Sequence, residues 1–200
     1  MPKIVDHEAR RAEITEVAVR LISEGGLEAA TIREIAGNSG HSKGVVEHYF
    51  DDKEELISAA LALVNERYRQ RSDKVSTSLR GIAAIRALLG ITLPMTPELR
   101  REWRVRLVFW SMASTDRRLG REQGERLQRA AEHFARHFEE AVEAGEIALR
   151  GTPEEAGRRL VNTVSGLSIA ALHNAEFGRR AFLEHEIEHL IDNLSGHAGI

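Results

Sequence analysis

Four closely spaced side chains in the first quarter of the chain could recognise the edges of DNA base pairs. Lys43 could donate hydrogen bonds to guanine O6 and N7, and Val45 could pack on a thymine methyl group. Glu47 could accept a hydrogen bond from cytosine N4, and His48 follows it directly. A helix in the major groove presents its first turn to the bases, and Gly44 permits a close approach. The spacing therefore predicts a recognition helix.

A helix-turn-helix would position these side chains, and residues 31–50 have its pattern. Thr31 is a typical N-cap residue, and Glu34 follows three residues later as its capping-box partner. Gly40 ends this first short helix, because a tight turn needs a left-handed residue and glycine adopts that conformation without strain. Ser42 then caps the second helix, which carries the base-reading residues.

The same stretch resembles the N-terminal signature of the TetR family of bacterial transcriptional regulators. The resemblance covers roughly residues 8–68 and extends to spacing as well as residue type. The matching positions are Thr31, Ile35, Ala36, Gly40, Ser42, Gly44, Tyr49, Phe50, Lys53 and Leu56. It implies that Thr31, Tyr49 and Lys53 contact DNA phosphates. Two positions depart from the family pattern: His41 replaces a small apolar residue, and Glu47 replaces a tyrosine that touches the DNA backbone.

The charge of this region is unusual for a DNA-binding domain. Residues 1–57 contain seven Lys and Arg against twelve Asp and Glu, a net charge of −5. Nonspecific affinity depends on neutralising phosphates, so we expect weak nonspecific binding and one face that gathers the few cations. Those cations are Lys3, Arg10, Arg11, Lys43 and Lys53. Glu47 reads a base, pairs with a cation or faces solvent, and the sequence leaves these three alternatives open.

Composition and periodicity predict an all-α fold of about nine helices and no strand. The chain has 200 residues, of which 42% are hydrophobic and 30% charged, and apolar residues recur at helical spacing. We expect a three-helix DNA-binding domain at 8–68 and a C-terminal sensing and dimerisation domain at 69–200, divided within the fourth helix. We expect the helices near the C-terminus to span residues 153–177 and 178–194, after Gly145 and the Thr152-Pro153 pair.

The chain contains no cysteine and no apolar run of about 18 residues. Neither a disulfide framework nor a thiol nucleophile is therefore possible, and we expect a cytoplasmic protein that does not engage membranes. No nucleotide-binding loop or dinucleotide fingerprint is present, and we expect neither a cofactor nor an enzymatic activity.

One helical face in the second half could line a pocket for a small-molecule effector, which the family resemblance implies. It carries Trp103, Leu107, Trp110 and Ser114. Together with residues 166–174, this face is similar to the subgroup that includes the choline-responsive repressor of betaine synthesis. An aromatic wall could bind a quaternary ammonium by cation–π attraction. Aromatic residues at helical spacing are more often part of the core, and that alternative remains open.

A single short helix buries too little surface for useful operator affinity, so we expect a homodimer that reads a palindromic operator in double-stranded DNA. Apolar stripes on the last two helices supply the expected dimer contact, and part of each stripe must also serve the core of its own chain. The stripe residues are Leu160, Val164, Leu167, Ile187, Leu190 and Leu194.

Residues 185–189 read HEIEH and match H-E-x-x-H, in which two histidines bind Zn²⁺ and the glutamate polarises water. A zinc hydrolase is therefore one alternative function. Only eleven residues follow the motif, and no third ligand lies at a suitable spacing. A metal-sensing variant could instead use His185 and His189, or His133 and His137, which have the same spacing. Exposed histidines on charged helices are the favoured interpretation of both pairs, without a metal. The acidic N-terminal region supports a second alternative, a helical interaction module that does not bind DNA.

Overall fold

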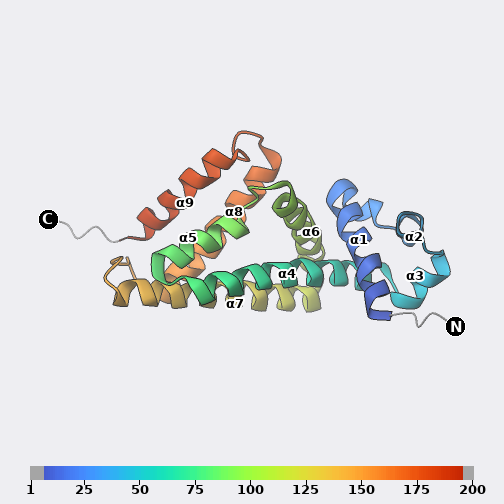
Figure 1. The fold of residues 1–200 in the computed structure, drawn as a ribbon, viewed down its shortest axis with the longest axis horizontal. Helices are drawn as coiled ribbons and strands as arrows, with labels where there is room; N and C mark the ends of the chain where they lie inside the picture. Colours follow the sequence, from blue (N-terminus) through green and yellow to red (C-terminus); the bar gives the residue numbers. More distant parts are fainter. Residues whose placement is uncertain (1–6, 196–200) are drawn as a thin grey trace. The chain divides into compact units, whose positions relative to one another are not determined.

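The computed structural model describes residues 7–195, and within this range the chain is almost entirely helical (Figure 1). The predicted all-α fold is confirmed, and a single isolated bridge between Leu149 and Ser195 is the exception in the described part. The described helices are α1 (His7–Ala29), α2 (Ile32–Ser39), α3 (Lys43–Tyr49), α4 (Lys53–Ser78), α5 (Gly81–Thr92), α6 (Pro97–Ala113), α7 (Arg117–Glu143), α8 (Pro153–His173) and α9 (Arg180–Leu194).

Two compact units divide the described chain. The first contains the described residues up to Arg67 together with Arg101–Met112, and the second contains Tyr68–Arg100 with the described residues from Ala113 onward. Helix α4 therefore contributes to both units. Among residues 7–195 no single helix is long and apolar enough to cross a membrane. Helices α5 and α6 have the required length and composition only when they are taken together as a bent pair.

The first unit is built around the apolar faces of α1 to α4. Ile14, Ile35, Val46, Phe50 and Leu56 are almost completely buried and form one contiguous core. Helix α1 is interrupted at its end, where the backbone leaves the helical region at a glycine with a φ of 69°. The glycine pair at positions 25 and 26 thus interrupts the helix.

In the second unit, α7 packs against both α5 and α8, and α5 contacts α9. The crossing of α7 and α8 is close because Gly157 has no side chain: a Cβ atom there would lie 2.3 Å from the carbonyl oxygen of Ala131. The surrounding core includes Phe134, Phe138 and Leu160.

The end of α8 differs from the sequence prediction. The helix was expected to reach about Phe177, but it ends at His173. The side-chain oxygen of Asn174 accepts hydrogen bonds from the backbone N–H groups of Glu176 and Phe177, at 2.8 and 3.5 Å. This local alternative to helical bonding closes a turn, so α9 begins at Arg180 instead of Gly178.

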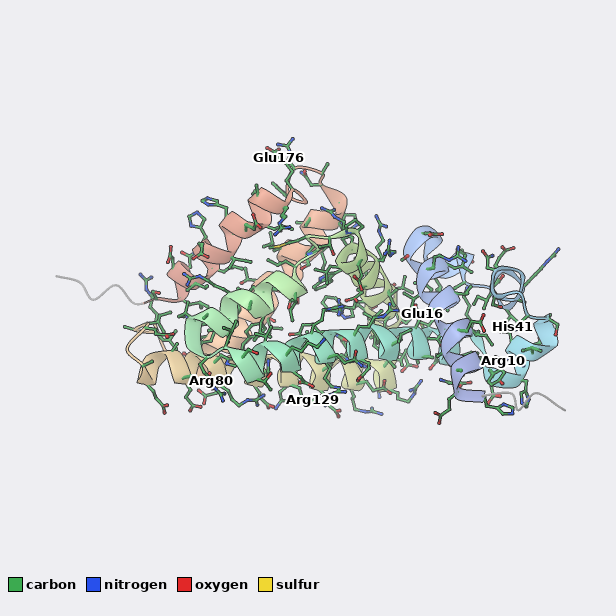
Figure 2. All side chains as sticks on the ribbon, viewed as in Figure 1. Arg10, Glu16, His41, Arg80, Arg129 and Glu176 are labelled. Atoms are coloured by element: carbon green, nitrogen blue, oxygen red, sulfur yellow. The ribbon has the colours of Figure 1, made fainter. Side chains whose placement is uncertain are left out.

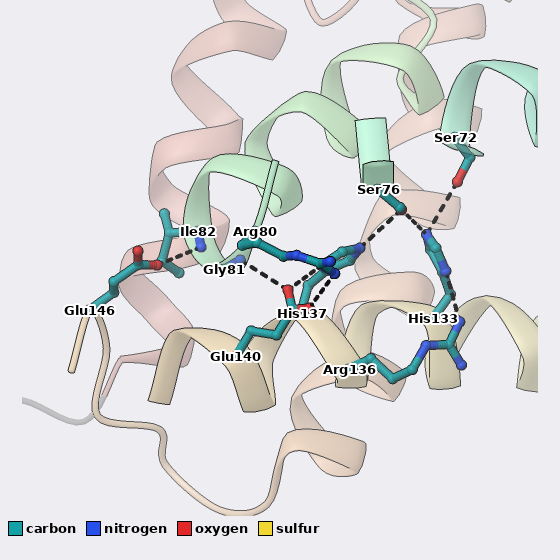
Figure 3. Close-up of polar contacts among 10 residues, drawn as sticks. All are labelled: Ser72, Ser76, Arg80, Gly81, Ile82, His133, Arg136, His137, Glu140 and Glu146. Atoms are coloured by element: carbon teal, nitrogen blue, oxygen red, sulfur yellow. Dashed lines mark hydrogen bonds and ion pairs between the residues drawn. The ribbon is translucent and has the colours of Figure 1, made fainter. Parts of the chain in front are cut away.

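A polar network joins α4, α7 and the start of α5 within the second unit (Figure 3). Nε2 of His133 lies 3.1 Å from the Ser72 hydroxyl, and Nε2 of His137 lies 3.2 Å from the Ser76 hydroxyl. Ser72 and His137 are only 5% and 3% exposed. Glu140 connects the network to α5, because it accepts a hydrogen bond from His137 at 2.8 Å and another from the first backbone N–H of α5 at 3.2 Å.

The partners of these histidines determine where their protons lie. A guanidinium can only donate, so Nδ1 of His133 accepts from Arg136 at 2.9 Å and its Nε2 carries the hydrogen. A carboxylate can only accept, so Nδ1 of His137 carries the hydrogen that reaches Glu140. The imidazole of His133 is therefore neutral in this arrangement. Burial lowers the pKa of His133, and the neighbouring His137 and Arg136 lower it further, against an opposing effect of Asp73.

Substitution of Gly157 tests the close crossing of α7 and α8. We expect Gly157→Ala to lower the free energy of unfolding by about 1–3 kcal/mol, because the added methyl group meets the α7 backbone. Gly166→Ala is the matched control in the same helix, where a Cβ atom has nothing within 4 Å. That change should be neutral or stabilising by up to about 1 kcal/mol. Urea unfolding of both variants checks this, and equal effects would contradict the close approach.

The histidine network predicts that stability falls in mild acid. The pKa of His133 is lower in the folded protein than its ordinary value of 6.5, so the unfolded chain binds the proton first as the pH falls. Stability is therefore fully present above that value and decreases below it. Hydrogen bonds from His137, Gly81 and Arg80 outweigh burial and lower the pKa of Glu140 from 4.5, so its contribution is lost only at more acidic pH.

Urea unfolding between pH 7.5 and 5.5 measures this effect, with a lower free energy of unfolding expected at the acidic end. His133→Gln keeps one donor and one acceptor but cannot titrate, so the pH dependence should become shallower. His173→Gln, at an exposed position at the end of α8, is the control and should keep the wild-type slope. Identical slopes in all three proteins would show that His133 does not cause the effect.

Candidate nucleic-acid interface

The predicted helix-turn-helix is present with its predicted caps. The Thr31 hydroxyl accepts a hydrogen bond from the backbone N–H of Glu34 at 3.1 Å at the start of α2. Gly40 ends that helix in the left-handed conformation, with φ 70° and ψ 14°. The Ser42 hydroxyl accepts from the backbone N–H of Val45 at 3.3 Å and starts α3. Local hydrogen bonds thus define the two helices and the turn between them.

Helix α3 has one buried side and one exposed side. Val46, in the middle of the helix, and Phe50, just after its end, are 0% and 1% exposed. The residues predicted to contact DNA lie mostly on the other side: Ser42, Lys43, Gly44, Glu47 and His48 are exposed, and Val45 and Tyr49 are half-buried and pack partly against the core. Thr31 is exposed and Lys53 is half-buried at the adjoining helix starts. The burial of Val46 and Phe50 therefore turns the predicted DNA-contacting residues of α3 outward.

Glu47 forms an ion pair within its own helix. Its carboxylate oxygen lies 3.0 Å from Nζ of Lys43, and the two side chains remain 50% and 66% exposed. The sequence left open whether Glu47 reads a base, pairs with a cation or faces solvent. In the protein without DNA, Glu47 pairs with a cation. An exposed pair of this spacing contributes only about 0.3–0.5 kcal/mol, so DNA can separate the two groups at little cost.

Tyr49 has a partner from the start of α1 that sequence reasoning missed. Its hydroxyl lies 2.9 Å from Nδ1 of His7, and the two rings are 5.8 Å apart between centroids. His48 completes the aromatic group, at 5.4 Å from the Tyr49 ring. An open recess of about 540 Å³ adjoins them, lined by His7, Arg10, Ser42, Gly44, Val45, His48 and Tyr49. The two partners are 42 residues apart, and no local pattern signals their contact.

The expected cations have different roles in the structure. Arg10 lines the recess beside α3, and Figure 2 shows it in the same unit as His41. Arg11 instead serves the fold, since its guanidinium lies 4.6 Å from the centroid of the Phe50 ring and 2.9 Å from the Glu55 carboxylate. Lys3 lies outside the described residues. The reading face therefore has fewer available cations than the sequence suggests.

The residues predicted to line an effector pocket are in different environments. Trp103 is 3% exposed and packs edge-to-face against Trp110, with ring centroids 5.8 Å apart. Leu107 is half-buried in the same helix. Ser114 is exposed and lies just beyond the end of α6, which stops at Ala113. The aromatic wall is thus formed largely inside the protein.

A separate groove of about 740 Å³ lies between α7 and α8. Its lining includes the apolar residues Leu127, Ala131, Ala135 and Val161. The sequence analysis did not identify this groove, because it depends on how two helices from different parts of the chain pack together.

Most of the predicted dimer stripe is buried within the chain itself. Leu160, Val164, Ile187, Leu190 and Leu194 are each between 1% and 9% exposed. Leu167 keeps part of its surface and packs at the edge of the same core. The apolar stripes of α8 and α9 therefore belong to the core of their own chain. A second copy of the chain would contact the exposed residues beside these stripes.

The zinc-hydrolase alternative requires a third ligand near His185 and His189. Within residues 7–195, no group of three or more histidine, aspartate or glutamate side chains is arranged to hold a metal ion. The later histidine, His197, lies outside the described residues.

Comparisons with known proteins match both parts of the chain. The family model described as "Bacterial regulatory proteins, tetR family" matches residues 14–60, and the model described as "BetI-type transcriptional repressor, C-terminal" matches residues 81–195. The regulator PksA of Bacillus subtilis is 38% identical over 116 residues, which span 56% of each protein. The regulator BetI of Burkholderia ambifaria is 28% identical over 192 residues, covering 92% of this chain and 93% of BetI.

Solved structures have the same fold at lower identity. A transcriptional regulator from Rhodococcus superposes with a TM-score of 0.80 at 24% identity, covering 92% of this chain and 95% of that one. A regulator from Saccharomonospora viridis, solved in complex with choline, has a TM-score of 0.78 at 23% identity, with 95% and 99% coverage. The chain thus belongs to the TetR family of bacterial regulatory proteins, and it is a DNA-binding transcriptional regulator whose C-terminal part is of the BetI type.

Proposed function

We propose that this regulator is a cytoplasmic, homodimeric repressor that reads a palindromic operator with α3 and releases it when a small molecule binds the C-terminal helices. Residues 8–68 read DNA, and residues 69–200 sense the effector and form the dimer. The observation that carries the proposal is the outward side of α3, where Lys43, Gly44, Glu47 and His48 are exposed while the buried Val46 and Phe50 anchor the helix.

In this proposal the exposed residues divide into two roles. Lys43, Val45, Glu47 and His48 face base edges, and Gly44 lets the helix approach the groove. Phosphate contacts come from Thr31, Ser42, Tyr49 and Lys53 at and near helix starts. The Lys43–Glu47 pair opens on the operator, so that each group meets its own base. Because the pair also neutralises a cation in the free protein, it keeps nonspecific affinity low.

The effector in this proposal is a small molecule with a quaternary ammonium or similar cation. Trp103 and Trp110 supply aromatic faces for cation–π attraction, and Leu107 and Ser114 lie near the wall in sequence. Support comes from the BetI-type match and from the choline-bound regulator of similar fold. Titration calorimetry with choline tests the effector class, and Trp110→Ala should weaken any binding.

The dimer in this proposal forms through the outward faces of α8 and α9. The buried members of the stripe, such as Leu160 and Ile187, support those faces from behind, and Leu167 contributes its exposed edge. Two-fold pairing places two copies of α3 on one side of a duplex, which is what a palindromic operator requires.

Selection of bound sequences from a random duplex pool tests the function, with the purified chain at about 0.1 M salt, where charges are screened over about 10 Å. Enrichment of one palindrome supports a dimeric reader and supplies the operator for release assays. No enrichment, with or without choline, would favour the alternative of a helical interaction module, which the acidic N-terminal region supports.

Glu47→Gln tests base reading by α3. We expect the preference at one base pair of each half-site to relax by about 1–3 kcal/mol, because an amide also donates and no longer selects cytosine N4. Glu143→Gln removes the same charge from the exposed end of α7 and should leave both affinity and preference unchanged. A gain of affinity that is uniform across sequences would place Glu47 beside phosphates and contradict base reading.

His7→Phe and Tyr49→Phe test whether the His7 contact orients the Tyr49 hydroxyl for DNA. Each variant keeps an aromatic ring and removes one partner of the 2.9 Å hydrogen bond. We expect each to weaken operator binding by about 1 kcal/mol. The double variant should lose little more than either single one, since the two groups act as a unit. Additive losses in fluorescence-anisotropy titrations would show that the residues act independently.

A further inference from the structure

Two histidine pairs in the described chain have the same spacing of four residues, but they have different surroundings. In the α7 pair, His133 and His137, all four ring nitrogens lie within 3.2 Å of another protein group: Arg136, Ser72, Ser76 or Glu140. A guanidinium at Nδ1 of His133 also repels any added cation. This pair is a structural element of the α4–α7 contact.

The α9 pair is arranged differently. His185 and His189 are both exposed, one helical turn apart on the outside of the helix. Their Nε2 atoms point at each other and lie 2.8 Å apart, and the rings are nearly perpendicular at 87°. The Nε2 positions of His185 and His189 thus converge on one point at the protein surface. In neutral imidazoles, one of these nitrogens donates the shared hydrogen and the other accepts it.

We propose that His185 and His189 form a bidentate site for a divalent late transition-metal ion of the Zn²⁺, Ni²⁺ or Cu²⁺ class. Imidazole nitrogen is a preferred ligand of these ions. Tetrahedral bonds of about 2.0–2.1 Å place two nitrogens roughly 3.3 Å apart, so a separation change of about half an ångström admits the ion. The ion takes the place of the shared hydrogen, which moves to Nδ1 of the same ring.

The local charge favours a cation at this position. The same helix contains four acidic residues, Glu184, Glu186, Glu188 and Asp192, and one basic residue, Arg180. Glu188 and Glu184 are paired with Arg86 and Arg180, at 2.7 Å each, so they are not ready ligands, and the net negative charge on this helix comes from Glu186 and Asp192. The described residues supply two ligands and no third, so water or donors from a second chain complete the coordination. The site therefore binds metal without forming the hydrolase centre that the HEIEH motif suggests.

Calorimetric titration of the chelator-treated full chain with Zn²⁺ at pH 7.5 tests the site. We expect saturable binding in the wild type and a loss of affinity on the order of 100-fold in both His185→Gln and His189→Gln, because either change removes the chelate. His173→Gln is the matched control at a single exposed histidine, and it should bind like the wild type. One ion per chain or one per two chains supports the site equally, since both imidazoles are needed in either case.

Two further measurements separate this site from nonspecific binding to carboxylates. Binding should weaken in acid, because protons compete with the metal ion for imidazole nitrogens, whereas carboxylates keep binding to lower pH. Mg²⁺, which prefers oxygen ligands, should give no saturable binding. Electron paramagnetic resonance of the Cu²⁺ complex should detect two equivalent nitrogens. Unchanged Zn²⁺ affinity in both glutamine variants, with wild-type melting temperatures, would overturn the proposal, as would the absence of saturable binding in the wild type.

Discussion

The reading face of this protein depends on the burial of one side of a very short helix. Helix α3 has seven residues, and a helix of that length is not stable in water without tertiary contacts. Val46 and Phe50 supply those contacts, and the core below them is completed by Ile14, Ile35 and Leu56. Because two side chains fix the orientation of the helix, Lys43, Gly44, Glu47 and His48 are exposed, and Val45 and Tyr49 keep part of their surface. The caps at Thr31 and Ser42 set where the helices begin, but burial sets which side faces outward.

This face carries little positive charge that is available to DNA. The region has more acids than bases, and its structure commits part of the positive charge to internal contacts: Arg11 to Glu55 and Phe50, and Lys43 to Glu47. A reader of this kind gains little from general attraction to phosphates. In the proposed function, operator affinity therefore comes mainly from a good fit to bases and from hydroxyl and backbone donors, which favours specific over nonspecific binding.

The second unit relies on close helix contacts and on buried polar groups. Gly157 brings the backbones of α7 and α8 together, and the network of Ser72, Ser76, His133 and His137 connects α4 to α7. Buried polar groups of this kind stabilise a structure only when each has a partner. The network meets that condition with a neutral His133, which links the α4–α7 contact to pH. The same residue type at the same spacing on α9 has no such packing partners and remains on the surface.

Sequence alone determined the features that depend on neighbours in the chain. The all-α class, the caps at Thr31 and Ser42 and the left-handed Gly40 all follow from short-range hydrogen bonding and helical periodicity. Tertiary structure decided the rest. Periodicity shows that the stripes of α8 and α9 are apolar, but only packing shows that Leu160 and Ile187 are buried in their own chain. The contact of His7 with Tyr49 and the different environments of the two histidine pairs likewise depend on residues that are distant in sequence, and no local pattern encodes which distant groups meet.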